Sequence, residues 1–174
     1  MRSDEPVILI VDDSQNDVML MRIVFQRVGL QKELQFANGA DDAIAYLAGA
    51  GRYSDRNQFP LPSAVLLDLN MPGKNGFEML EWIRGQAAFR RLRVYILSAS
   101  SRPEDIERAY ELGANSYLVK PRNLDGLVRL AKALVAWLRI SHFAPLKRVD
   151  RADEPAPDDR IGVQLESARN RATG

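Results

Sequence analysis

The 174-residue sequence contains no cysteine and only one histidine, His142. Without thiols the chain can form no disulfide, no thiolate metal centre and no cysteine nucleophile. With one histidine, neither a zinc site nor a histidine-based triad is expected. No apolar run is long enough to span a membrane, and the first residues lack the apolar core of a signal peptide. We therefore expect a cytoplasmic protein that does not enter a membrane.

The sequence also lacks an excess of either positive or negative charge. The 24 basic and 23 acidic residues leave a net charge of +1, which gives no reason to expect binding to nucleic acid. Apolar residues make up 46% of the chain, enough for a hydrophobic core. The length fits one domain with an appendage.

Short apolar runs alternate with helical patterns along the chain, which predicts an α/β fold with a parallel sheet covered by helices on both faces. We expect strands over residues 6–11, 33–37, 63–68, 92–97 and 115–119. We expect helices over residues 14–28, 40–47, from 76 onward, 103–113 and 124–143. The polar loop 52–60 is long for such a connection, and it is either functional or mobile. The domain should span residues 1–144, and the polar residues 145–174 should form a disordered tail.

Acidic side chains end two of these strands. Asp12 and Asp13 follow the first apolar run, and Asp68 follows the third. The carboxyl ends of parallel strands form the ligand-binding edge of such a sheet, so these carboxylates should meet there. Their repulsion favours a hard divalent cation, and Mg²⁺ is the usual one in phosphate chemistry. Taken alone, Asp12-Asp13 could equally cap the following helix.

The next two strands also end in polar residues, Ser98 and Lys120. Together with the segment Asp68-Leu-Asn-Met-Pro72, Gly76, Ser98-Ala99 and Tyr117-Leu-Val-Lys120-Pro121, the pattern resembles the receiver domain of two-component response regulators over residues 7–143. The resemblance implies a flavodoxin-like (βα)5 receiver fold. It also implies a phosphoprotein of phosphorelay signal transduction, which accepts a phosphoryl group and is not an enzyme.

The resemblance assigns roles to individual residues. Asp68 would accept the phosphoryl group from a histidine kinase. Asp13 and Asp68, with the backbone carbonyl of Asn70, would ligate Mg²⁺, and Asp12 would hold a metal-bound water. Ser98 and Lys120 would contact the phosphoryl oxygens.

Three further features follow from the same resemblance. Ala99 is small and would leave the phosphoryl pocket open. Tyr117 would be the aromatic residue that turns inward when the face formed by the fourth helix, fifth strand and fifth helix switches. From residue type alone, Tyr117 is a half-buried strand residue with its hydroxyl in water. The Lys120–Pro121 peptide would be cis.

Finer features resemble receivers paired with bacterial phytochrome histidine kinases. These are the extended loop before the third strand, the run from Ala109 to Leu118, and the end of the last helix at 136–140. About thirty polar residues follow that helix, too few for a winged helix, so a stand-alone receiver is expected. Two alternatives remain: a receiver-like module that acts without phosphorylation, and a Mg²⁺-dependent phosphatase with Asp68 as nucleophile. Asn70 argues against the phosphatase, because such enzymes usually place a second aspartate there.

The last helix carries more apolar residues than one stripe packed on a sheet requires. We therefore expect a homodimer through this helix. The expected anchors are Leu134, Trp137, Leu138 and Phe143.

Overall fold

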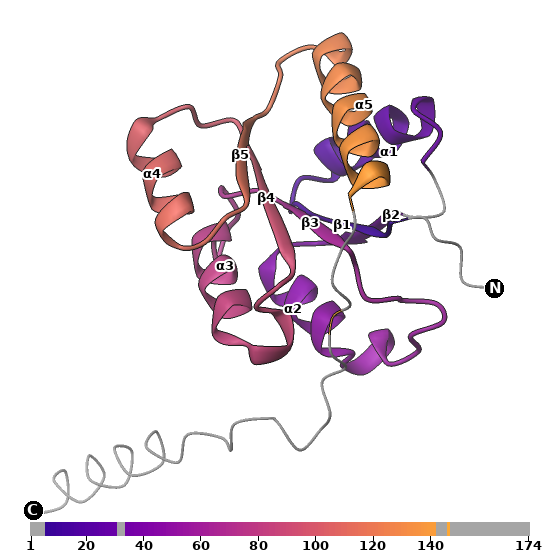
Figure 1. Ribbon diagram of the computed structural model, residues 1–174, viewed down its shortest axis with the longest axis vertical. Coiled ribbons are helices and arrows are strands. Elements are labelled where there is room, and N and C mark those ends of the chain that lie inside the picture. Colours follow the sequence, from indigo (N-terminus) through magenta and orange to yellow (C-terminus); the bar gives the residue numbers. More distant parts are fainter. Residues whose placement is uncertain (1–5, 31–33, 142–145, 147–174) are drawn as a thin grey trace, which may run out of the picture.

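The sheet has five parallel strands in the order β2-β1-β3-β4-β5, which confirms the expected flavodoxin-like α/β fold (Figure 1). The computed structural model describes residues 6–30, 34–141 and 146. The strands are β1 (Ile8–Val11), β2 (Leu34–Ala37), β3 (Ala64–Leu67), β4 (Arg93–Ser98) and β5 (Ser116–Val119).

Helices cover both faces of this sheet. They are α1 (Gln15–Arg27), α2 (Ala40–Ala48), α3 (Gly76–Gly85), α4 (Pro103–Glu111) and α5 (Leu124–Ile140), with short 3-10 turns at Gly51–Tyr53 and Ala87–Phe89. In Figure 1, α1 and α5 lie together on one side of the strands, and α2 and α3 lie on the other. Two apolar clusters result, one beneath α1 and α5 and one beneath α2, α3 and α4.

Strands β1 and β3 are apolar at every position because both of their faces are covered. All four residues of β1 and all four of β3 are buried. Val11 pairs with Leu67 in the parallel register, so the residues that follow them, Asp12 and Asp68, leave the sheet at the same edge. The register therefore places the acidic side chains together.

The loop over residues 52–60 is tied to the body of the protein. Tyr53 is buried and packs in the cluster with Tyr46. The Arg56 guanidinium donates hydrogen bonds to the backbone carbonyls of Tyr46 (2.8 Å) and Leu47 (2.6 Å) at the end of α2. Because these contacts satisfy helix-end carbonyls, the loop serves as a cap for α2.

The apolar residues of α5 that are exposed to solvent are not all the ones that we expected. Leu134 and Leu138 are 7% and 2% exposed and belong to the core between α1, α5 and the sheet. The expectation that the sheet leaves them free is wrong, because α1 packs beside α5 and widens the buried stripe. Trp137 is 57% exposed and Ile140 is 73% exposed. Phe143 and all of the expected tail except Leu146 lie outside the described residues.

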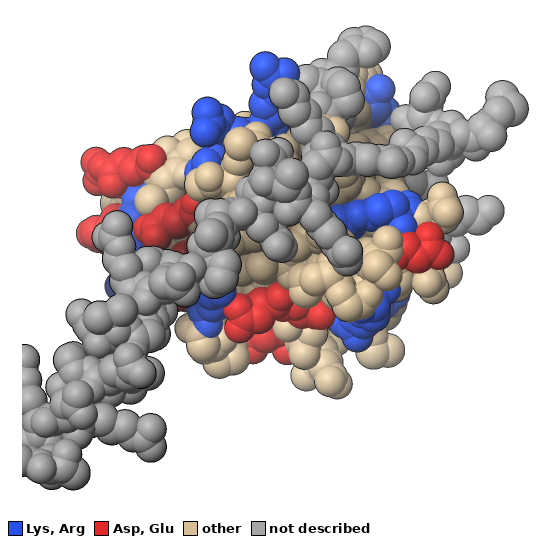
Figure 2. All heavy atoms as spheres, turned by 90° about the horizontal axis from the view of Figure 1, so that it is seen from below, with Lys and Arg blue, Asp and Glu red and all other residues tan. Residues whose placement is uncertain are grey.

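The molecular surface carries charges of both signs. Figure 2 shows basic and acidic side chains interspersed on one face of the molecule. Among the described residues, no helix has the length and apolar character that crossing a membrane requires.

Candidate functional site

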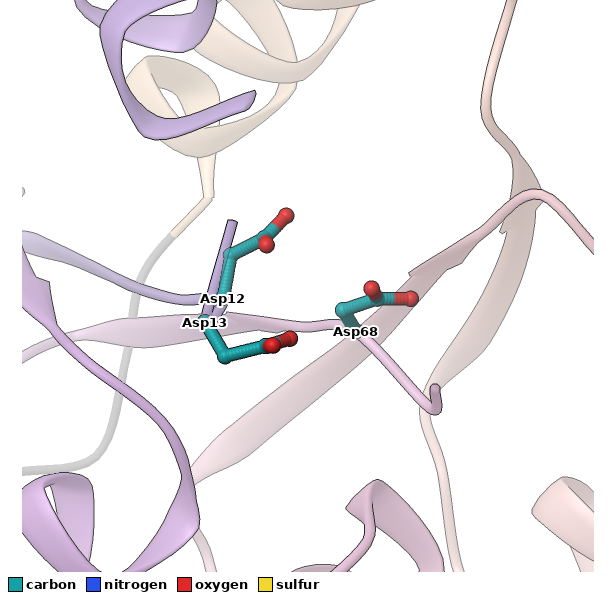
Figure 3. Close-up of side chains that lie close together, drawn as sticks. All are labelled: Asp12, Asp13 and Asp68. Carbon is teal, nitrogen blue, oxygen red and sulfur yellow. The ribbon is translucent and has the colours of Figure 1, made fainter. Parts of the chain in front are cut away.

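Three carboxylates meet at the carboxyl edge of the sheet. Asp12 and Asp13 follow β1, Asp68 follows β3, and one oxygen from each lies within 4.8 Å of the others. Figure 3 shows the three side chains close together, with the Asp13 carboxylate extending toward Asp68. A group of oxygen ligands this close is the donor set that hard divalent cations prefer, so the residues present fit such an ion.

Backbone hydrogen bonds of the sheet fix these positions. The Asp68 N–H donates to the Val11 carbonyl (3.0 Å), and the Asp12 N–H donates to the Ala37 carbonyl (3.3 Å). The Lys120 N–H donates to the Ser98 carbonyl (2.8 Å) in the same way. The four polar strand ends therefore share one edge because the parallel ladder continues through them.

The Asp68 side chain is only 13% exposed. Burial raises the pKa of its carboxyl, the nearby Asp12 adds to that rise, and the Lys120 charge opposes it. Asp68 therefore binds protons more readily than an exposed aspartate does, which is the expected result of crowding carboxylates in a low-dielectric crevice.

Lys120 supplies the positive charge of the site. Its ammonium donates to Asp12 Oδ2 (2.9 Å) and Asp17 Oδ2 (2.7 Å), and it lies 4.0 Å from Asp68 Oδ2. Burial by itself would lower the pKa of Lys120, but the hydrogen bonds to Asp17 and Asp12 outweigh it and raise the pKa. Lys120 is therefore held in its charged form.

The sequence analysis missed Asp17. This residue lies in the first turn of α1, where an acidic side chain is ordinarily explained by the helix dipole. Its spacing from the acidic pair, four residues after Asp13, could have indicated a fourth carboxylate on the site side of the helix. Lys120 reaches Asp17 only in the folded protein, where it follows β5 at the same edge of the sheet.

Ser98 is fully buried at the end of β4, and its hydroxyl is already engaged. It accepts hydrogen bonds from the Ser100 N–H (3.2 Å) and from the Asn70 side-chain amide (3.4 Å). Asn70 therefore approaches the site through its side chain as well as its backbone. Ala99, the next residue along the chain, is exposed.

Tyr117 is half-buried, and its hydroxyl donates to the Ser100 carbonyl (3.0 Å). The ring therefore ties β5 to the loop that follows Ser98. The hydroxyl is not left to water alone, as residue type by itself suggested. The expected cis peptide at Lys120–Pro121 is wrong, because the described part of the chain contains no cis peptide bond.

The comparisons with known proteins agree with this geometry. Residues 8–132 match the model of the response regulator receiver domain. The chain belongs to this family. Receiver domains are generally not classed as enzymes, and the acidic triad of Asp12, Asp13 and Asp68 is typical of their metal site.

The relatives of this receiver domain include response regulators of phytochrome signalling. It is 35% identical over 133 residues to response regulator Rcp1 of Synechocystis sp., covering 76% of this chain and 88% of Rcp1. The Mn²⁺-bound form of Rcp1 superposes with a TM-score of 0.71 at 33% identity, covering 80% of this chain and 99% of Rcp1. The relative's metal agrees with the oxygen donor set described above.

Two further solved structures are similar. The phosphorylated cyanobacterial phytochrome response regulator RcpA gives a TM-score of 0.73 at 30% identity, covering 81% of this receiver domain and 99% of RcpA. Response regulator RPA3017 in red light signaling of R. palustris gives 0.72 at 34% identity, covering 82% and 98%. The receiver domain thus resembles response regulators of phytochrome systems.

Proposed function

We propose that this receiver accepts a phosphoryl group on Asp68 from a histidine kinase, with Mg²⁺ as cofactor. The observation that carries the proposal is the crevice itself. Three carboxylates lie close together there, and a charged lysine lies 4.0 Å from Asp68. Phosphoryl transfer needs positioning and charge stabilisation, and these residues supply both.

An oxygen of the Asp68 carboxylate bonds to phosphorus while the P–N bond of a phosphohistidine breaks. The imidazole nitrogen keeps the electron pair and takes up a proton. The product is an acyl phosphate, which water can later hydrolyse back to the carboxylate.

The ligands proposed for Mg²⁺ are Asp13, Asp68 and the backbone carbonyl of Asn70, with Asp12 holding a metal-bound water. When bound, the ion neutralises charge on the carboxylate and phosphoryl oxygens. Lys120 would donate to a phosphoryl oxygen, and Ser98 would exchange its hydrogen bonds to Asn70 and Ser100 for one to another phosphoryl oxygen.

A switch follows from the same contacts. Movement of Ser98 toward the phosphoryl group would disturb the loop whose Ser100 carbonyl accepts from the Tyr117 hydroxyl. Tyr117 would then turn inward and change the face made by α4, β5 and α5. A local electrostatic event would in this way change a distant surface.

The likeness to Rcp1, RcpA and RPA3017 supports a bacterial phytochrome kinase as the donor, acting in the cytoplasm. Homodimerisation through α5 is also proposed. The exposed Trp137 and Ile140 support it, since large apolar side chains rarely cluster on a free surface. A second copy would cover them.

Labelling with phosphate tests the phosphoacceptor. The unaltered protein, Asp68→Asn and Asp41→Asn are each incubated with a ³²P-labelled histidine kinase and Mg²⁺. Asp41 is the matched control, because its side chain is 82% exposed on α2 and pairs only with Lys74 in the described structure. We expect label on the unaltered protein and on Asp41→Asn, none on Asp68→Asn, and none when EDTA removes Mg²⁺. Full labelling of Asp68→Asn contradicts the proposal.

A further inference from the structure

Lys120 closes a ring of hydrogen bonds at the start of α1. Its ammonium donates to Asp12 Oδ2 and to Asp17 Oδ2. The other Asp12 oxygen accepts from the Ser14 N–H (2.8 Å), and the Ser14 hydroxyl accepts from the Asp17 N–H (3.3 Å). Asp12, Ser14, Asp17 and Lys120 therefore hold one another in place, although more than a hundred residues separate Lys120 from the other three.

The ring uses only two of the three N–H donors of the Lys120 ammonium. An ammonium group has three donors and no acceptor. Two are taken by Asp12 and Asp17, at 2.9 and 2.7 Å. The nearest Asp68 oxygen, at 4.0 Å, is beyond hydrogen-bonding distance. One of the three donors is therefore unspent, and it remains available to a phosphoryl group on Asp68.

A hydrogen bond to Asp12 alone would not fix the Lys120 ammonium in this position. A lysine side chain has a flexible four-carbon stem, so a single hydrogen bond leaves its ammonium free to turn about that contact. Without Asp17, the ammonium could move across the 4.0 Å gap and pair with Asp68 directly. That pair would occupy the carboxylate that must bind the cation and attack phosphorus.

The solvent exposure of Asp17 indicates that its contact with Lys120 serves to position the ammonium more than to stabilise the fold. Asp12 and Lys120 are 5% and 14% exposed, whereas the Asp17 side chain is 41% exposed. An ion pair with one partner so exposed contributes little to folding stability, at most about 1 kcal/mol. Its effect on the position of a buried ammonium does not depend on that contribution.

We propose that Asp17 is a positioning residue, which holds Lys120 away from Asp68 and directs its third N–H toward the incoming phosphoryl group. This proposal rests on the proposed function of Asp68. It predicts that Asp17 acts only through Lys120, since the two are in direct contact and Asp17 reaches no other part of the site in the described structure.

A double-mutant cycle tests the dependence on Lys120. Asp17→Ala, Lys120→Ala and the double variant are labelled with a small phosphodonor, acetyl phosphate, so that binding of a kinase does not enter the measurement. In the chain with Lys120, Asp17→Ala should slow labelling of Asp68 about tenfold, a coupling usual for residues in contact. In the Lys120→Ala background the same change should have no effect. Asp17→Asn, which keeps an oxygen acceptor, should restore part of the rate.

Mg²⁺ affinity, measured by calorimetry without any phosphodonor, gives a second readout. Asp17→Ala should weaken Mg²⁺ binding in the chain with Lys120, because the freed ammonium competes for Asp68. It should not do so when Lys120 is alanine. Equal losses in both backgrounds would mean that Asp17 acts through its own charge, and the proposal would be wrong.

Asp125→Ala is the matched control. Asp125 is an exposed aspartate in the first turn of α5, so it reproduces the loss of a helix-start charge without a contact to Lys120. It should leave both the labelling rate and Mg²⁺ affinity unchanged. If the unaltered protein takes no label on Asp68, the proposed function fails. If it takes label and Asp17→Ala labels equally fast, only the role of Asp17 is refuted.

Discussion

The ammonium nitrogen of Lys120 lies 4.0 Å from Oδ2 of Asp68 and hydrogen-bonds two other carboxylates instead. Lys120→Ala should therefore remove a donor to the phosphoryl group without removing a metal ligand. We expect Mg²⁺ affinity to stay equal or rise, because one competing positive charge is gone. Phosphorylation should slow roughly a hundredfold, which is the effect that loss of one oxyanion donor has in enzymes. Calorimetry and phosphate labelling measure the two effects, and strongly weakened Mg²⁺ binding would contradict this role.

Asp13→Ala should have the opposite pattern. Removing a direct ligand from a small oxygen site should weaken Mg²⁺ binding by at least about tenfold. Labelling should then be restored in part by raising the Mg²⁺ concentration. The exposed Asp41→Ala serves as the control for loss of one negative charge. Unchanged metal affinity in Asp13→Ala would exclude Asp13 as a ligand.

The stability of the metal-free protein should depend on Asp68 and on pH. Burial raises the pKa of Asp68 in the folded state above its value in the unfolded chain. The ionised carboxylate therefore destabilises the fold above the folded pKa, and the penalty vanishes below the unfolded pKa, where both states are protonated. Asp68→Asn should melt at a higher temperature than the unaltered protein at neutral pH, and the difference should shrink on acidification. A difference that grows as pH falls would refute this account.

Gly76 should tolerate no side chain. It is the first residue of α3, and a Cβ there would overlap the Asp68 carbonyl oxygen and lie 2.8 Å from the Leu69 Cα. Both are backbone atoms that cannot turn away, so Gly76→Ala should cost about 1–3 kcal/mol of stability and reduce phosphorylation of Asp68. Gly85, the last residue of the same helix, has no such neighbour within 4 Å. Gly85→Ala should leave both thermal unfolding and labelling nearly unchanged, and equal behaviour of the two variants would contradict the steric argument.

Two adjacent residues of α5 should separate folding from assembly. Leu138 is buried against the sheet, so Leu138→Ala should destabilise the fold by about 2–5 kcal/mol. Trp137 is 57% exposed, so Trp137→Ala should change stability by no more than about 0.5 kcal/mol and should weaken the proposed dimer. Denaturant unfolding and analytical ultracentrifugation measure these effects. Sedimentation of the unaltered protein as a monomer at high concentration would exclude the dimer.

Much of the fold and the site could be predicted from local sequence. The apolar runs that become β1 and β3 are buried on both faces, so these strands show no polar alternation and each ends where its apolar run ends. Asp68 directly follows β3, Ser98 is the last residue of β4, and Lys120 directly follows β5. The α/β class, the acidic edge and the family could therefore be inferred without coordinates.

Other features depended on how elements pack, which no local pattern records. Leu134 and Trp137 are both large and apolar, and only the position of α1 beside α5 decides that one is core and the other surface. The loop over residues 52–60 has the composition of a mobile connection, and only the tertiary structure shows Arg56 capping α2.

The residue types at the strand ends follow from local sequence, because strand termination and strand burial are local properties of the chain. Which of those residues touch depends on how the whole chain packs. The parallel register of β1 and β3 places Asp68 beside Asp12. The pairing of β5 with β4 places Lys120 within hydrogen-bonding distance of Asp17 on α1. Asp17 acquired a partner 103 residues away for that reason. A contact of such sequence separation is set by the packing of the whole sheet.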